Sequence, residues 1–250
     1  MGSQILITGG VALTGLLAGV VTNYLSEILP SQPFSVYPKC SNCGSRLSLG
    51  TYMYLTKSCR VCHKRLTLRI WVVNFALIAI SLYIYVFSPE SIGALFGYMA
   101  AIFFGTLMVI DIEHRIIPYS LTLTGTVLGL VIGTTRVGIT FALFGGFVGF
   151  IVMLAIYLLG IVFIKVSNRF RKSQINEPAL GFGDVLLGGV LGLMIGWPEI
   201  LNSLVISIFI AGAFSLIVML VMLFARKYNF GTAFPYAPFL IAVAFHTLFI

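Results

Sequence analysis

Apolar residues occur along the chain in long runs that short polar segments separate. A helix needs about 20 apolar residues to cross the hydrocarbon core of a membrane, and about 17 suffice. The pattern predicts an all-α, polytopic membrane helix bundle of about eight transmembrane helices. They are expected at residues 4–29, 70–87, 92–110, 119–133, 139–164, 184–197, 200–225 and 232–250.

The composition supports a membrane protein over a soluble one. Hydrophobic residues make up 59% of the 250 residues and charged residues 9%. A soluble domain has about 45–50% apolar and about 25% charged residues, so a globule could not bury this excess. A chain with 14% aromatic residues and so few charges is also unlike a disordered one.

The basic residues predict how the chain is oriented. There are 15 Lys and Arg against 7 Asp and Glu, and every basic residue except Arg136 lies on one side of the expected helices. Cytosolic loops carry the excess of Lys and Arg in membrane proteins. We therefore expect both termini outside and the 31–69 loop in the cytosol. The net charge of +8 is then explained by basic loops on the cytosolic side of the membrane. The expected partner is therefore the lipid bilayer, and no nucleic acid partner is expected.

Glycines recur at four-residue spacing in two of the expected helices. This spacing places them on one helix face, where another helix can approach closely. The second series extends backwards by four residues to Asp184. The two series are Gly125, Gly129, Gly133 and Gly188, Gly192, Gly196.

All four cysteines lie in the 31–69 loop, as two Cys-x-x-Cys pairs that fifteen residues separate: Cys40, Cys43, Cys59 and Cys62. This spacing is typical of a four-thiolate zinc site, which stabilises a short loop that has no core of its own. Two disulfides are the alternative, and a reducing cytosol disfavours them. Because four protein ligands complete the site, the zinc is predicted to be structural. His63 is interpreted as a surface residue.

Three of the seven acidic residues stand out by position. Glu27, Glu90, Glu177 and Glu199 fall at run ends or in loops and are interpreted as solvated rims, whereas Asp111 and Asp184 lie at the cytosolic ends of two expected helices. An ionisable residue at the edge of a span is a candidate functional residue. Two carboxyls at one depth could share a proton and activate a water, which is aspartic-peptidase chemistry. Glu113 is an alternative to Asp111.

The residues before Asp184 allow two interpretations. Gly181 and Gly183 lack side chains, so an extended substrate backbone could approach Asp184 there. Alternatively, Asp184 is a favourable charge at a helix N-terminus. The residues alone leave both interpretations open.

Five segments in order resemble the bacterial type IV prepilin peptidase family, also called prepilin leader peptidase/N-methyltransferase. They are Gly15 to Pro30 with Asn23, the paired cysteines, Asp111 to Pro118, Gly181-Phe182-Gly183-Asp184, and Phe234-Pro235-Tyr236-Ala237-Pro238-Phe239. The resemblance implies a peptidase of the bacterial inner membrane with Asp111 and Asp184 as catalytic pair. Its substrates would be prepilins or pseudopilins, cut after a Gly in a short basic leader. It also implies methylation of the new N-terminus with S-adenosylmethionine.

Four positions depart from the family pattern. Leu186 replaces a usual Lys, Tyr119 an acidic residue, Ile28 an Arg and Asn74 a Glu. These changes leave the aspartate pair intact but cluster near the loop linked to methylation, so methylation is the weaker expectation. The alternatives are a presenilin-like intramembrane peptidase, a proton- or cation-coupled transporter, and a zinc-stabilised assembly protein without chemistry.

The expected organisation has three parts. Residues 1–30 form a first transmembrane helix that is retained, residues 31–69 form the cytosolic four-cysteine loop, and residues 70–250 form the transmembrane aspartic peptidase domain.

Overall fold

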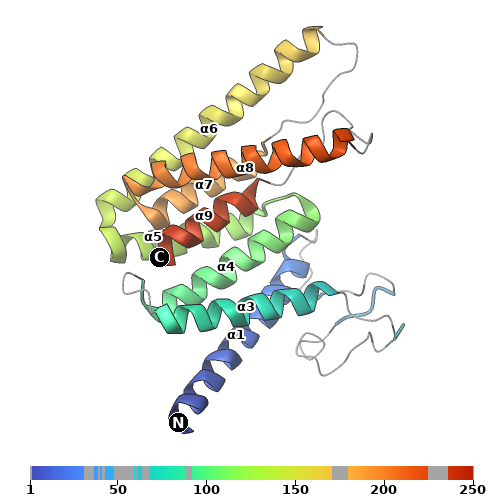
Figure 1. Cartoon of the computed structure of the whole chain (residues 1–250), viewed down its shortest axis with the longest axis vertical. Coiled ribbons are helices and arrows are strands. Elements are labelled where there is room, and N and C mark those ends of the chain that lie inside the picture. Colours follow the sequence, from blue (N-terminus) through green and yellow to red (C-terminus); the bar gives the residue numbers. More distant parts are fainter. Residues whose placement is uncertain are drawn as a thin grey trace. The chain divides into compact units, whose positions relative to one another are not determined.

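The computed structural model describes the chain in ten stretches: residues 2–30, 37–38, 40, 43–47, 59, 61–63, 68–87, 92–170, 180–224 and 236–249. The expected helices are all present in these residues, which confirms the all-α class (Figure 1). They are α1 (Gly2–Ile28), α3 (Leu68–Phe87), α4 (Gly93–His114), α5 (Tyr119–Val137), α6 (Ile139–Phe170), α7 (Phe182–Ile195), α8 (Glu199–Phe224) and α9 (Ala237–Phe249).

Six of the described helices are long and apolar enough to cross a membrane, and α7 and α9 are shorter apolar helices. Helix α7 has 14 residues because its boundaries are set by glycines and a proline. Gly181 is its N-cap, and Gly196 ends it with φ of +81°, a conformation that favours glycine. Pro198 follows two residues later, where a proline prevents continuation of the helix.

The chain divides into two compact units, each described by itself. The first contains Met1–His114 together with Phe249, and the second contains Arg115–Leu248 together with Ile250. Helices α3 and α4 lie in the same unit as α1. Asp111 therefore lies in the first unit and Asp184 in the second.

In the first unit, α1 packs along α3 and α4 through small and polar residues. A Cβ at Gly15 would lie 2.7 Å from the Cα of Ile78, so glycine is needed for this close approach. Ser81 Oγ donates to the Val11 carbonyl oxygen at 2.7 Å, and Asn23 Nδ2 donates to Asn74 Oδ1 at 3.0 Å. Hydrogen bonds between helices satisfy polar groups that membrane lipid cannot.

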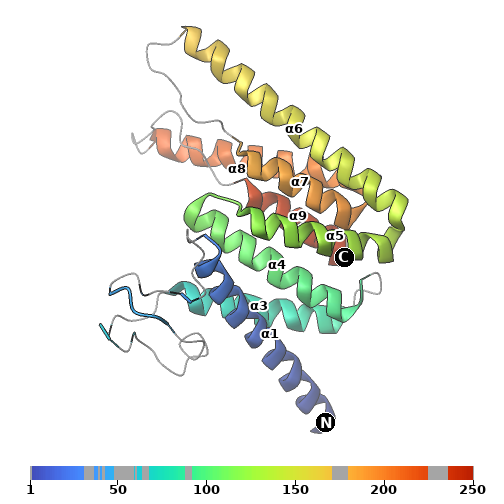
Figure 2. The ribbon, with the colours of Figure 1, turned by 180° about the vertical axis from the view of Figure 1, so that it is seen from behind.

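In the second unit, α7 packs against both α5 and α6 (Figure 2). On α5, a Cβ at Gly129 would lie 3.0 Å from the Val190 carbonyl oxygen, and Gly133 lies directly against Leu193. On α6, a Cβ at Gly145 would lie 2.6 Å from the Gly192 carbonyl oxygen. The close helix faces predicted from the two glycine series are confirmed.

The glycine face of α6 provides a stability test. Gly145→Ala should lower the stability of the protein in detergent by about 1–3 kcal/mol, because the added methyl group overpacks the α6–α7 contact. Gly160→Ala is the matched control on the same helix, since its Cβ would meet nothing within 4 Å. Thermal unfolding should show a lower midpoint for the first variant only. Equal midpoints would contradict the close packing.

Arg136, the basic residue that falls on the other side of the expected membrane, is bound by its own unit. Its Nη2 lies 2.9 Å from Glu199 Oε2, and its Nη1 donates to the Ile195 carbonyl oxygen at 2.9 Å. Nη2 also donates to the Thr247 carbonyl oxygen at 3.3 Å. Glu199 is thus an ion-pair partner as well as a rim residue, and Arg136 satisfies carbonyls at two helix ends.

Candidate active site and candidate metal centre

Asp184 lies in the first turn of α7. Its Oδ2 accepts a hydrogen bond from the Gly181 backbone amide at 3.1 Å, and its own amide donates to the Gly181 carbonyl oxygen at 3.1 Å. The side chain is buried, with 8% exposed. This geometry satisfies one of the free amides at the helix N-terminus, where a negative charge is favoured. It confirms the interpretation of Asp184 as a favourable charge at a helix N-terminus. The catalytic interpretation stays a prediction.

The two glycines before Asp184 have different surroundings. Gly181 is exposed, and the nearest atom to a Cβ placed there is Asp184 Oδ2 at 3.5 Å. A Cβ at Gly183 would lie 2.9 Å from the Cβ of Ile117. Gly183 is therefore covered by Ile117, which lies in the short connection before α5, whereas the space at Gly181 is open.

Asp111 lies in the last turn of α4 and is buried, with 5% exposed. It shares a face of the helix with Leu107 and Phe104, four and seven residues earlier, which are also buried. The helix ends at His114, and Arg115 has φ of +54°. A residue with positive φ cannot continue a right-handed helix, so the chain turns there towards Pro118 and α5.

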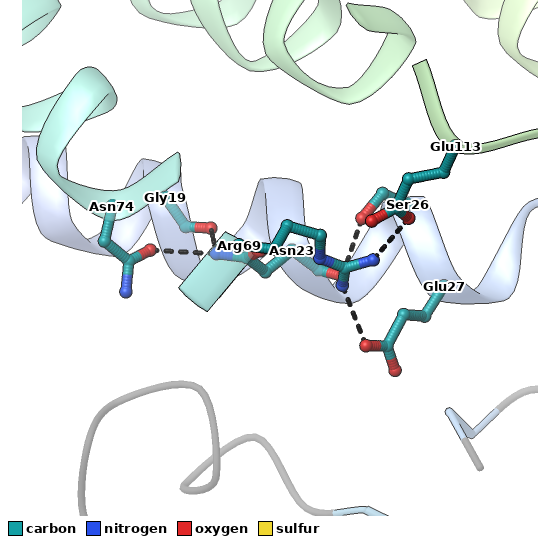
Figure 3. Close-up of polar contacts among 7 residues, drawn as sticks. All are labelled: Gly19, Asn23, Ser26, Glu27, Arg69, Asn74 and Glu113. Atoms are coloured by element: carbon teal, nitrogen blue, oxygen red, sulfur yellow. Dashed lines mark hydrogen bonds and ion pairs between the residues drawn. The ribbon is translucent and has the colours of Figure 1, made fainter. Parts of the chain in front are cut away.

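Arg69 joins three helices of the first unit at one place (Figure 3). Its Nη2 lies 2.8 Å from Glu27 Oε1 at the end of α1, and its Nη1 lies 2.6 Å from Glu113 Oε2 at the end of α4. The expectation that Glu27 is a solvated rim residue was incomplete, because 25% of its side chain is exposed and it is ion-paired. Glu113 is ion-paired with the same arginine.

Sequence reasoning did not identify Arg69 as a partner of these carboxylates. The available signal was that Glu27, Arg69 and Glu113 all lie near helix ends on the same expected side of the membrane. That signal does not say which ends meet. The pairing depends on how α1, α3 and α4 pack.

The four cysteines converge as their spacing predicts. Their sulfur atoms all lie within 4.8 Å of one another. Cys40 Sγ is 3.6 Å from Cys62 Sγ, and Cys43 Sγ is 3.6 Å from Cys59 Sγ. Four thiolates about 2.3 Å from a tetrahedral zinc ion would be about 3.8 Å apart, so these four sulfurs could bind such an ion. None of the four forms a disulfide, so all four sulfurs are available as ligands.

Each Cys-x-x-Cys pair forms the same turn. The Gly44 amide donates to the Cys40 carbonyl oxygen at 2.9 Å, and the His63 amide donates to the Cys59 carbonyl oxygen at 3.0 Å. Gly44 and His63 both have positive φ, +70° and +55°. The imidazole of His63 is exposed and lies outside the four-sulfur cluster, as expected.

Hydrogen bonds favour the thiolate form of two of the cysteines. The Cys62 amide, the Ser45 hydroxyl and the Val61 amide lower the pKa of Cys59 to about 5. The pKa of Cys43 is also lowered, chiefly by the Ser45 hydroxyl, which lies 3.0 Å from its sulfur. Since thiolates and not thiols bind metal ions, these donors prepare the cluster for a cation.

Comparison with known proteins gives two kinds of match. Residues 98–216 match the type IV leader peptidase family, and this segment includes both aspartates. The chain is 26% identical to a prepilin leader peptidase/N-methyltransferase of Pseudomonas putida, over 81% of this chain and 68% of that protein. It is 25% identical to a protein of the same name from Stutzerimonas stutzeri, over 85% and 73%. No solved structure matches the chain.

Proposed function

We propose, from the premise that residues 98–216 match the type IV leader peptidase family, that this protein is a prepilin peptidase. It removes the short basic leader of prepilins or pseudopilins by cutting after a Gly, just before the hydrophobic helix of the substrate. The observation that carries the proposal is the presence, within the matched segment, of two buried aspartates at helix ends, Asp111 and Asp184.

In the proposed mechanism, Asp111 and Asp184 form an aspartyl pair that shares one proton. One carboxylate takes a proton from a water molecule, whose oxygen attacks the carbonyl carbon of the scissile peptide. The other carboxyl supplies a proton, the C–N bond breaks and the new amine leaves with that proton. Both motifs, Asp111 to Pro118 and Gly181 to Asp184, lie within the segment that matches the family, which supports their assignment to one reaction.

The substrate approaches Asp184 along the glycines that precede it. Gly181 offers open space for an extended backbone, whereas Gly183 is covered by the Ile117 side chain. A residue with a Cβ at Gly181 would narrow this approach. The cut lies at the cytosolic edge of the inner membrane, in the orientation that the basic residues predict.

The four-cysteine loop holds one structural zinc ion in this proposal. Cys40 and Cys43 would bind it together with Cys59 and Cys62, and the bound ion would link the two cysteine pairs between α1 and α3. All four ligands are protein thiolates, which leaves no open position for catalysis.

A second step is methylation of the new N-terminal amine with S-adenosylmethionine as the methyl donor. It is supported by the name of the relatives, which includes N-methyltransferase. Ile28 and Asn74 depart from the family pattern near the loop linked to this step. Asn74 is buried and bonded to Asn23, so it serves the contact of α1 with α3.

Incubation of the purified protein with a prepilin tests both steps. The product should have lost the whole leader, including the Gly after which the cut is made. With S-adenosylmethionine present it should gain about 14 Da, one CH₂ group. A cut within the hydrophobic helix would favour a presenilin-like peptidase. Failure to cut any prepilin, with pH-driven uptake in liposomes, would replace the peptidase with a transporter.

A further inference from the structure

Arg69 and its two partners, Glu27 and Glu113, form a charged cluster within the first unit, which we call the Arg69 cluster (Figure 3). The Arg69 side chain is 19% exposed, and each terminal nitrogen of its guanidinium binds one carboxylate. A planar guanidinium can hold two carboxylates in fixed directions, which a lysine ammonium does less well. Because the groups are partly buried, salt screens them less than a surface pair.

The partners of Arg69 give it two connections. Glu27 lies at the end of α1 and Arg69 at the start of α3. Their ion pair therefore joins the two helices between which the segment with the four cysteines lies in the sequence. Glu113 lies one residue before the end of α4. The Arg69 cluster therefore connects the last turn of α4 to the end of α1 and the start of α3.

The opposite sides of α4 have different roles. Successive residues of an α-helix are about 100° apart, so Asp111 projects about 200° away from Glu113. On the side that faces α1 and α3, a Cβ at Gly105 would contact Thr22 and Leu77 at 3.3 and 3.4 Å. Glu113 extends this attachment to the end of the helix, and Asp111 points elsewhere.

The last turn of a helix lacks partners for its carbonyl groups and frays unless something restrains it. Asp111 lies in that turn. Catalytic groups must be placed accurately, since a displacement of about 1 Å can cost about 100-fold in rate. A restraint on the opposite side of the same turn would supply this accuracy.

We propose that Arg69 is a positioning residue that fixes the last turn of α4 through Glu113, and thereby fixes the rotation and depth of Asp111. The inference rests on the proposed peptidase function. Arg69 touches neither substrate nor reacting atoms. It acts through Glu113, which its Nη1 holds, whereas the separate pair of its Nη2 with Glu27 does not reach α4.

The test compares two variants that remove one carboxylate each from the same arginine. Glu113→Gln should lower kcat for leader cleavage by about 10- to 100-fold, with KM within about twofold, because binding is kept and alignment is lost. Glu27→Gln is the matched control and should stay within about threefold of the wild-type kcat. The double variant Arg69→Gln with Glu113→Gln should be no worse than the more impaired single variant, since both remove one interaction. Arg69→Lys should retain more activity than Arg69→Gln.

Hydrogen exchange of the amides of residues 110–114 gives a readout that does not depend on activity. It should be faster in Glu113→Gln than in the wild type or in Glu27→Gln. Unchanged kcat and unchanged exchange in Glu113→Gln would overturn the inference, and so would a rise in KM alone. If the wild-type protein cuts no prepilin, the proposed function fails, and the exchange rates still decide whether the Arg69 cluster restrains α4.

Discussion

Leader cleavage is expected to fall at least about 1,000-fold when either Asp111 or Asp184 is changed to asparagine. General acid–base groups contribute about 10²- to 10⁴-fold each, and an aspartyl pair acts as a unit, so the loss of one member removes most of the effect of both. Single-turnover cleavage of a prepilin by purified protein measures this. The double variant should be about as slow as either single one.

The structure indicates why these variants keep the fold. An asparagine at position 184 retains a side-chain oxygen that can accept from the Gly181 amide, as Asp184 Oδ2 does now. Thermal unfolding in detergent should therefore change little. Full cleavage activity in either the Asp111→Asn or the Asp184→Asn variant would contradict the aspartyl mechanism. Loss of activity in Glu113→Gln equal to that in Asp111→Asn, with normal exchange in α4, would point to Glu113 as the catalytic partner.

About one zinc ion per chain is the second large expectation, because the four thiolates complete one tetrahedral site. Cys59→Ser should lose the metal, whereas Ser45→Ala should bind it and release it more easily. Elemental analysis of protein purified under reducing conditions measures the content. Less than about half an ion per wild-type chain would count against the site.

Binding of zinc by the four cysteines should weaken as the pH falls. The pKa of Cys59 is lowered from 9.0 to about 5, so its contribution to loop stability is complete above pH 9 and is lost as the pH falls through 5. Metal should be retained at pH 6 and released below about pH 5, where protons compete for the thiolates. In Ser45→Ala, release should begin at a higher pH, because the Ser45 hydroxyl no longer lowers the pKa of Cys59. Release at the same pH in both proteins would contradict the role given to Ser45.

Prediction from sequence succeeded where the signal is local. Apolar runs gave the helices and their order, and the structure changes their boundaries by a few residues. Helix α6 extends to Phe170, past the end of its apolar run at position 164, through the largely polar residues 165–170. The two Cys-x-x-Cys pairs predicted a four-sulfur cluster because each pair is brought together by a single turn. The glycine series predicted close helix faces because four-residue spacing is a property of one helix.

The orientation in the membrane and the pairing of Asp111 with Asp184 stay predictions. The first rests on the distribution of basic residues, and the second on the motifs and on the burial of both carboxyls. The cleavage and exchange experiments bear on them directly.

The sequence by itself determined the class of the protein, the segments that form helices, the cluster of cysteines and the candidate aspartates. Only the tertiary structure decided that Gly145 of α6 meets Gly192, that Arg69 joins Glu27 to Glu113, and that Ile117 covers Gly183. The physical reason is the distance along the chain. Helix periodicity relates residues three or four positions apart, whereas 44 positions separate Arg69 from Glu113, and their contact exists only because three helices pack at particular rotations.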